Sequence, residues 1–150
     1  MAPNKQQLKD AIEHISFEMN RYLYTAHPIS LPGRYGEVVA ESCLLHSRAI
    51  GEFFFEPKKG DDIRIIHYYD ELISKDELKI KINKFQSNWE GYKKRTNKKL
   101  CHLTFSRVNS TPMNMQEKND VNFDILITLF ENNLPIDYKE KWDHGKSFSR

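Results

Sequence analysis

The sequence has little cysteine and no long apolar run, and each absence excludes a class of protein. Its two cysteines, Cys43 and Cys101, are too few for the disulfide framework of a small secreted domain. The sequence has no CxxC pair or clustered Cys/His spacing of the kind that holds structural zinc. No segment approaches the roughly 18 apolar residues that span a bilayer. We therefore expect two buried free thiols, no structural zinc and no membrane partner.

The remaining composition is typical of one globular domain. Residues 1–5 lead into a polar helical pattern and not into the apolar core of a signal sequence, so we expect a cytoplasmic protein. Hydrophobic residues make up 39% of the chain, which is enough for one sizeable core. Nine Phe and seven Tyr predict that this core or a cleft is rich in rings. The net charge of +2 neither requires nor excludes a nucleic-acid partner, and no motif indicates a cofactor.

Apolar residues recur at helical spacing in the first half of the chain. A first helix over residues 4–26 begins at Asn4, and Pro28, Pro32 and Gly33 interrupt the pattern after it. A second, strongly apolar helix covers residues 35–55. Its predicted inner face consists of Val38, Val39, Ser42, Leu45, His46, Ala49, Ile50 and Phe53.

The second half continues the helical pattern after an irregular segment at residues 63–72. One helix runs to about Phe85, and the next carries Trp89 and ends near residue 109. A polar loop at 113–120 precedes a last helix over 121–133, and the mixed tail 136–150 contains Trp142, which we expect to dock on the core. The predicted fold is an all-α bundle of four to five helices with irregular loops, formed by residues 1–135, with a polar C-terminal tail.

A basic stripe on the predicted helix of residues 89–109 could bind phosphate. Arg95 and His102 are seven residues apart, close to two helical turns, so their side chains share one side of the helix. Lys98 and Lys99 lie along or beside that stripe. Cations hold an anion, and a neutral imidazole can move a proton near pH 7.

The spacing of Arg95 and His102 in a late helix resembles the HEPN superfamily, whose signature is an Arg followed after four to six residues by a His. Many active members are metal-independent RNases with a site formed at a dimer interface. The resemblance implies that Arg95 binds the scissile phosphate and that His102 assists attack by the ribose 2′-hydroxyl. RNA and a second copy of the chain would then be the partners.

A second likeness covers most of the predicted core, from about residue 38 to 107. The elements His46-Ser47-Arg48 and His102-Leu103-Thr104, the latter followed by Arg107, are similar to those of a group of uncharacterised bacterial proteins of similar length. This likeness implies a shared fold and a shared polar site, and it names no activity. The candidate ligand-binding residues are therefore His46, Arg48, Lys98, Lys99 and Arg107.

Each candidate also has a purely structural interpretation. His46 can be a core histidine with a hydrogen-bonding partner. Alternatively, His46 and His102 can hold a metal together with Glu41 or Glu52, although no metal-binding motif supports that. His102 can cover a core edge, and Arg95 with its lysines can form a solvated face. Arg48 can pair with Glu52 four residues on, or with Glu41.

Three functions fit these patterns. The first is a HEPN-like domain that binds or cleaves RNA without a metal. The second is a non-enzymatic interaction module, either a homodimer or the partner of another protein. The third is a bundle that binds a small ligand between its helices, in a pocket lined by His46, His102 and Tyr and Phe side chains. The two binding interpretations together rank slightly above catalysis, and the sequence does not decide whether the protein is an enzyme.

Overall fold

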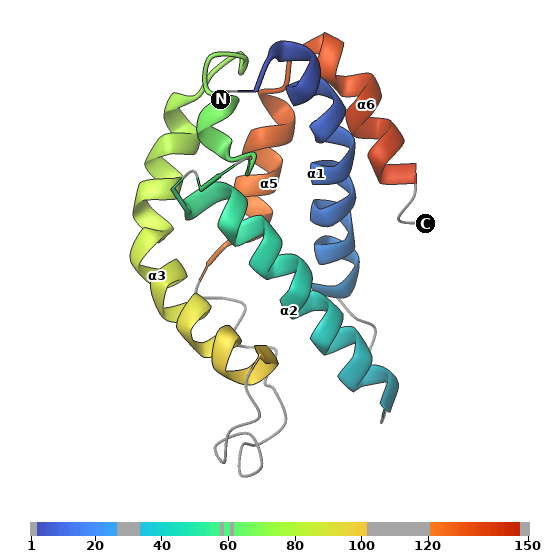
Figure 1. Cartoon of the computed structure of the whole chain (residues 1–150), viewed down its shortest axis with the longest axis vertical. Coiled ribbons are helices and arrows are strands. Elements are labelled where there is room, and N and C mark those ends of the chain that lie inside the picture. The colour runs from blue at the N-terminus through green and yellow to red at the C-terminus, as the bar shows by residue number, and fades with distance from the viewer. Residues whose placement is uncertain (1–2, 27–33, 58, 61, 102–120, 148–150) are drawn as a thin grey trace.

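The computed structural model describes residues 3–26, 34–57, 59–60, 62–101 and 121–147, and the side chains of residues 34–37, 40 and 97–101 lie outside this description. The elements are α1 (Lys5–Ala26), α2 (Arg34–Phe55), the short 3-10 helix η1 (Ile65–His67), α3 (Asp76–Cys101), α5 (Phe123–Asn132) and α6 (Ile136–Ser147). Across these described ranges there are five α-helices and no strand, which confirms the predicted all-α bundle. Figure 1 shows α2 crossing obliquely in front of α5, between α3 and α1, with α6 beside α1.

Helix α1 begins and buries its apolar face as its sequence predicts. The Asn4 side-chain oxygen accepts a hydrogen bond from the Gln7 backbone N–H, and the Gln7 side-chain oxygen accepts one from the Asn4 backbone N–H, each at 2.9 Å. This reciprocal pair caps the N-terminus. Leu8, Ile12, Met19 and Tyr22 are buried.

Helix α2 is rotated relative to the predicted face. Val38 and Leu45 are 64% and 58% exposed, and Ala49 is also exposed, so the prediction that they face the core was wrong. The buried set is Cys43, Leu44, Ser47, Ile50, Gly51, Phe53, Phe54 and Phe55. The prediction failed because α2 is apolar around most of its circumference, so the spacing of its apolar residues does not determine which face is buried. The prediction of a buried thiol holds for Cys43, whereas the Cys101 side chain lies outside the described ones.

Helix α3 is one continuous element, so the prediction of two helices that divide between Phe85 and Trp89 was wrong. Ile82 and Trp89 are both buried and lie seven residues apart, close to two helical turns. The residues between them contain no Gly or Pro and include exposed polar side chains, so nothing there interrupts the helix. The predicted helix end near residue 109 lies outside the described residues.

The C-terminal part of the chain adds a helix that the sequence pattern does not predict. Helix α5 matches the expected last helix, with Leu126 and Phe130 buried. Residues 136–147, treated as a polar tail, form α6, which packs on α1 through Tyr138, Trp142 and Gly145 (Figure 1). The expected docking of Trp142 is confirmed, because its side chain is 1% exposed.

Three contacts fix α6 against α1. The Ser16 hydroxyl donates a hydrogen bond to the Trp142 carbonyl oxygen at 2.6 Å. A β-carbon on Gly145 would lie 2.3 Å from the Glu13 carbonyl oxygen, so the helices approach this closely because residue 145 has no side chain. The Lys9 ammonium reinforces the contact with an ion pair to Asp137 at 2.6 Å.

Aromatic rings fill the space between the helices. Phe53 and Tyr68 pack edge-on against Phe130, with ring centroids 5.4 and 5.5 Å apart. Phe55 stacks on Trp89 at 5.7 Å with an interplanar angle of 16°. Such pairs add about 0.5–1.5 kcal/mol each beyond the area that they bury. The ring-rich core that the composition predicts is therefore confirmed.

Trp89 fits against α2 because residue 51 is glycine. A β-carbon on Gly51 would lie 2.0 Å from Trp89 Cζ3 and 2.2 Å from Cη2. Both distances are far below van der Waals contact, so the indole occupies the space of a missing side chain. This contact sets the separation of α2 and α3.

No helix within the described residues is long and apolar enough to cross a membrane.

We expect Gly51→Ala to lower the free energy of unfolding by about 3 kcal/mol, because the added methyl group overlaps a buried indole ring that has no free space. Gly91→Ala is the matched control. Its β-carbon would meet only the flexible Arg95 side chain, at 3.4 Å, and alanine favours a helix over glycine by about 0.5–1 kcal/mol. Urea denaturation followed by circular dichroism measures both. Equal stability of the two variants would contradict the close contact.

Candidate functional site

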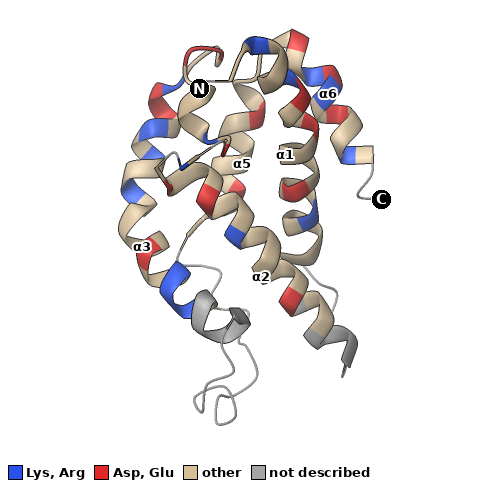
Figure 2. Cartoon of the chain, viewed as in Figure 1, with Lys and Arg blue, Asp and Glu red and all other residues tan. Residues whose placement is uncertain are grey.

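The basic stretch of α3 lies at the end of the helix nearest Cys101 (Figure 2). Tyr92 and Thr96 are buried, at 1% and 2% exposure, and they fix which side of the helix faces the core. Lys94 is therefore exposed, and Arg95 is half-buried. A β-carbon on Gly91 would lie 3.4 Å from Arg95 Nη1, so the guanidinium folds back over the preceding turn.

Lys93 belongs to a structural contact and not to an open basic face. Its ammonium lies 2.7 Å from Glu56 Oε1, and Trp89 Nε1 donates a hydrogen bond to the same oxygen at 2.8 Å. Burial alone would raise the pKa of Glu56. The hydrogen bonds from Lys93 and Trp89 and the charges of Lys93 and Arg64 outweigh burial, so the pKa lies below its ordinary value. The ionised carboxylate thus joins the end of α2 to α3.

The other members of the predicted phosphate site lie outside the description. His102 and Arg107 are not among the described residues, and the side chains of Lys98 and Lys99 are not described either. The predicted approach of His102 to Arg95, and of His102 to His46, is therefore not tested by the geometry. Of the HEPN-like pair, only Arg95 has a described position.

His46 is half-buried and has a partner on another helix. Its Nδ1 lies 2.7 Å from Glu18 Oε2 of α1, and the Phe17 ring packs edge-on at 6.4 Å. This contact matches the interpretation of His46 as a histidine with a satisfied ring nitrogen. The carboxylate is neither Glu41 nor Glu52, the two considered for a metal. Within the described part of the chain, no three His, Cys, Asp or Glu side chains come together as metal ligands.

Arg48 forms the helical ion pair that its spacing predicts. Its Nε donates a hydrogen bond to Glu52 Oε1 at 3.0 Å, four residues along α2. The pair is partly exposed, at 35% and 31%, so it contributes about 0.3–0.5 kcal/mol. The described contacts of Arg48 and His46 do not bring the two side chains into one site.

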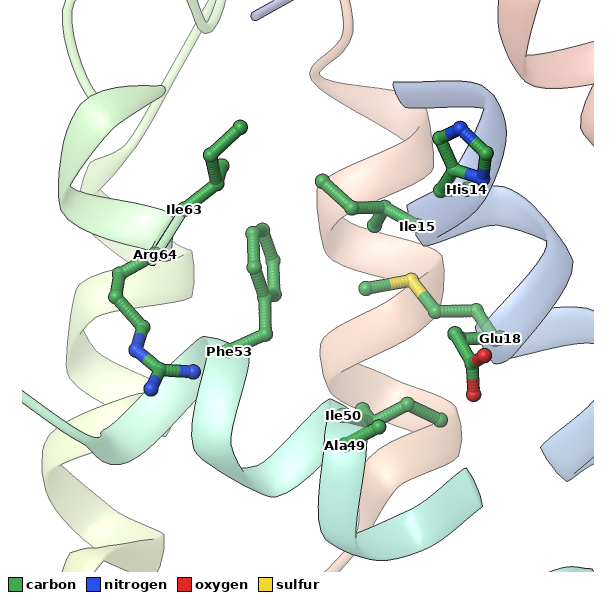
Figure 3. A pocket seen from close by; sticks show the side chains of 9 residues that line it. His14, Ile15, Glu18, Ala49, Ile50, Phe53, Ile63 and Arg64 are labelled. Carbon is green, nitrogen blue, oxygen red and sulfur yellow. The ribbon is translucent and has the colours of Figure 1, made fainter. Parts of the chain in front are cut away.

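A cavity of about 160 Å³, partly open to solvent, lies between α1 and α2. Figure 3 shows His14, Ile15 and Glu18 on the α1 side, Ala49, Ile50 and Phe53 along α2, and Ile63 and Arg64 on the opposite side. Met19 completes the lining. Met19, Ile50 and Phe53 are each at most 5% exposed, so the cavity reaches the aromatic core.

Arg64 is the charged group on the side of the cavity opposite α1. Its side chain is 12% exposed, and Nη2 donates a hydrogen bond to Asp62 Oδ2 at 2.7 Å. The Nε atom is buried and has no hydrogen-bond partner among the residues that the structure describes. A buried N–H of a charged group that lacks a partner is costly, and because this atom has almost no accessible surface, a ligand in the cavity does not reach it.

The sequence pattern misses the polar residues of this cavity. His14 and Glu18 are four residues apart on α1 and therefore share one face of the helix. This spacing can be recognised in the sequence alone. Arg64 follows a loop and is brought to α2 by the tertiary fold, because Ile65 and Tyr68 beside it are buried. Nothing in the local sequence links it to α1.

We expect Glu56→Gln to lower the free energy of unfolding at pH 7 by about 1 kcal/mol, because a neutral amide accepts weaker hydrogen bonds from Lys93 and Trp89. Since the folded-state pKa of Glu56 is lowered, its stabilisation is present above the ordinary pKa of about 4.3 and is lost as the pH falls through the folded-state value.

The difference between wild type and variant should therefore shrink below about pH 4. Urea titrations from pH 7 to pH 3 measure it. Glu90→Gln, at an exposed position on α3, is the control and should differ little from wild type. A pH-independent difference for Glu56→Gln would show that its carboxylate charge is not responsible.

Comparisons of the chain with protein-family models, with curated proteins and with solved structures find no match. The resemblance of Arg95 and His102 to the HEPN signature therefore stays a prediction.

Proposed function

We propose that this protein is a helical bundle that binds a small ligand in the cavity between α1 and α2. The observation that carries the proposal is a partly open cavity that reaches the core at Ile50 and Phe53 and has a partly buried charged residue, Arg64, on its wall. Ligand sites in proteins are mostly apolar concavities with a few convergent polar groups. The cavity of this protein has both kinds of lining, apolar side chains and polar groups such as Arg64.

The cavity volume limits the ligand. At about 160 Å³ it is close to the engineered apolar cavity of roughly 150 Å³ that binds benzene. It is smaller than the roughly 300–1,000 Å³ of sites for drug-sized compounds. The ligand is therefore a compound with one ring or a short branched chain.

We expect a neutral one-ring probe, benzyl alcohol, to bind saturably in the millimolar range, the weak affinity that about eight heavy atoms can supply. Heteronuclear NMR titration would show the largest shifts in Ile15, Met19, Ile50 and Ile63. Ala49→Leu should abolish binding, because residue 49 is exposed and lines the cavity, so a longer side chain can cover the opening without entering the core.

Val38→Leu, at an exposed position elsewhere on α2, is the matched control and should bind as wild type does. Absence of saturable binding to the wild-type protein, or unchanged binding to Ala49→Leu, would overturn the proposal.

A second candidate is the HEPN-like RNA-binding or RNase function, favoured by the exposed Lys94 and half-buried Arg95 near the end of α3 (Figure 2). In this proposal Arg95 holds the scissile phosphate and His102 moves the proton, without a metal. The resemblance implies that two copies of the chain supply the site.

For this candidate we expect the protein to cleave mixed single-stranded RNA in excess chelator. His102→Ala should lower the rate roughly a hundredfold or more, since proton transfer contributes about 10²–10⁴-fold. His144→Ala, at an exposed histidine of α6, should cleave as wild type does. No cleavage by the wild-type protein, or equal cleavage by His102→Ala, would reject the RNase function. Binding without cleavage would leave an RNA-binding role.

A further inference from the structure

The outer face of α2 carries apolar residues that the core does not bury. Val38 and Leu45 are mostly exposed, and Ala49 is also exposed. Their spacing of seven and then four residues places them along one line on the helix surface. Single exposed apolar side chains are common on proteins, but three in a line form a face on which a second helix can pack. Figure 1 shows α2 at the front of the bundle.

Charged residues lie along one side of this line. With 3.6 residues per turn, Glu41, Arg48 and Glu52 fall on one side of Leu45, and Val38 and Ala49 fall on the other. Glu41 precedes Leu45 by four residues, and Arg48 follows it by three. The charge therefore changes sign from one end of this face to the other, with Leu45 near its centre.

Such a face is complementary to itself when it is turned end for end. If two copies of α2 pack antiparallel and cross at Leu45, a two-fold axis relates them. Glu41 of each copy then lies beside Arg48 of the other, and the two Leu45 side chains meet at the axis. Parallel packing brings no opposite charges together at the same height. The charge pattern thus favours a second copy of this chain in an antiparallel orientation.

The pairing of Arg48 within its own helix is compatible with this contact. Arg48 Nε donates to Glu52 Oε1, and a guanidinium carries five N–H donors in one plane. It can therefore serve a carboxylate of its own helix and one of a second copy. Glu41 is exposed, and the residues three and four positions after it, Leu44 and Leu45, carry no charge.

We infer that the exposed face of α2 is the interface of a homodimer, in which two copies pack antiparallel about Leu45 and Glu41 of each pairs with Arg48 of the other. One helix face per copy gives a small interface, so the dimer is weak and exchanges with monomer. This interface lies on α2, whereas the HEPN resemblance implies one at Arg95 and His102. The inference goes beyond the proposed ligand binding and does not depend on it.

Sedimentation velocity over a concentration series of roughly 0.01–1 mM should show a monomer–dimer equilibrium with a Kd on the order of 100 μM. Leu45→Lys places two like charges at the axis and should weaken the dimer roughly tenfold or more. Ile80→Lys is the matched control on α3, because Ile80 is 65% exposed and Leu45 is 58% exposed, and it should dimerise as wild type does. A wild-type protein that stays monomeric, or a Leu45→Lys variant that dimerises equally well, would overturn the inference.

Charge reversal tests the antiparallel pairing. Glu41→Arg and Arg48→Glu each bring like charges together at both edges and should each dimerise roughly tenfold more weakly than wild type. In an equimolar mixture of the two variants, opposite charges face each other again, so dimerisation should return to about the wild-type level. A mixture that stays as weak as its components would contradict the pairing. Arg48→Glu also removes the ion pair with Glu52, so circular dichroism checks its fold, and the Leu45→Lys comparison decides even where that variant does not fold.

Discussion

The close contact between Gly51 and Trp89 is the constraint on which the rest of the bundle depends. The indole lies where a side chain of residue 51 would be, so it fixes how near α2 and α3 approach. From that position Trp89 stacks on Phe55 and donates its N–H to Glu56. The rotation of α3 follows from this anchoring, and it places Tyr92 and Thr96 inside and Lys94 outside.

The orientation of α2 about its axis forms one wall of the cavity. With Ile50, Phe53 and Phe54 directed into the core, Phe53 packs on Phe130 and Tyr68 on one side and faces the cavity on the other. The segment at Ile63 and Arg64 closes the third side, held by the buried Tyr68, whose hydroxyl donates to the Leu8 carbonyl oxygen at 2.9 Å. Core packing and the candidate site therefore share their side chains, and a change at Phe53 would affect both.

Charge pairing determines which basic residues are available for function. Lys93 pairs with Glu56 and so joins α3 to the end of α2. Arg48 pairs with Glu52 four residues along and so stabilises α2 alone. Arg64 also pairs with a carboxylate, but its buried Nε keeps a donor without a partner in the described structure. The candidate site is therefore distinguished by its apolar cavity with Arg64 on the wall, and not by the density of positive charge along the chain.

The sequence by itself determined the helical class and the start of α1 at Asn4, because these follow from helical periodicity and local capping. It did not determine the inner face of α2, where apolar residues surround the helix, or the existence of α6. The buried residues of α6 are two aromatic rings and a glycine among charged residues, and their helical order depends on contacts with α1. Only the tertiary structure decided the cavity, since Glu18, Phe53 and Arg64 come from three separate segments whose meeting depends on packing between helices.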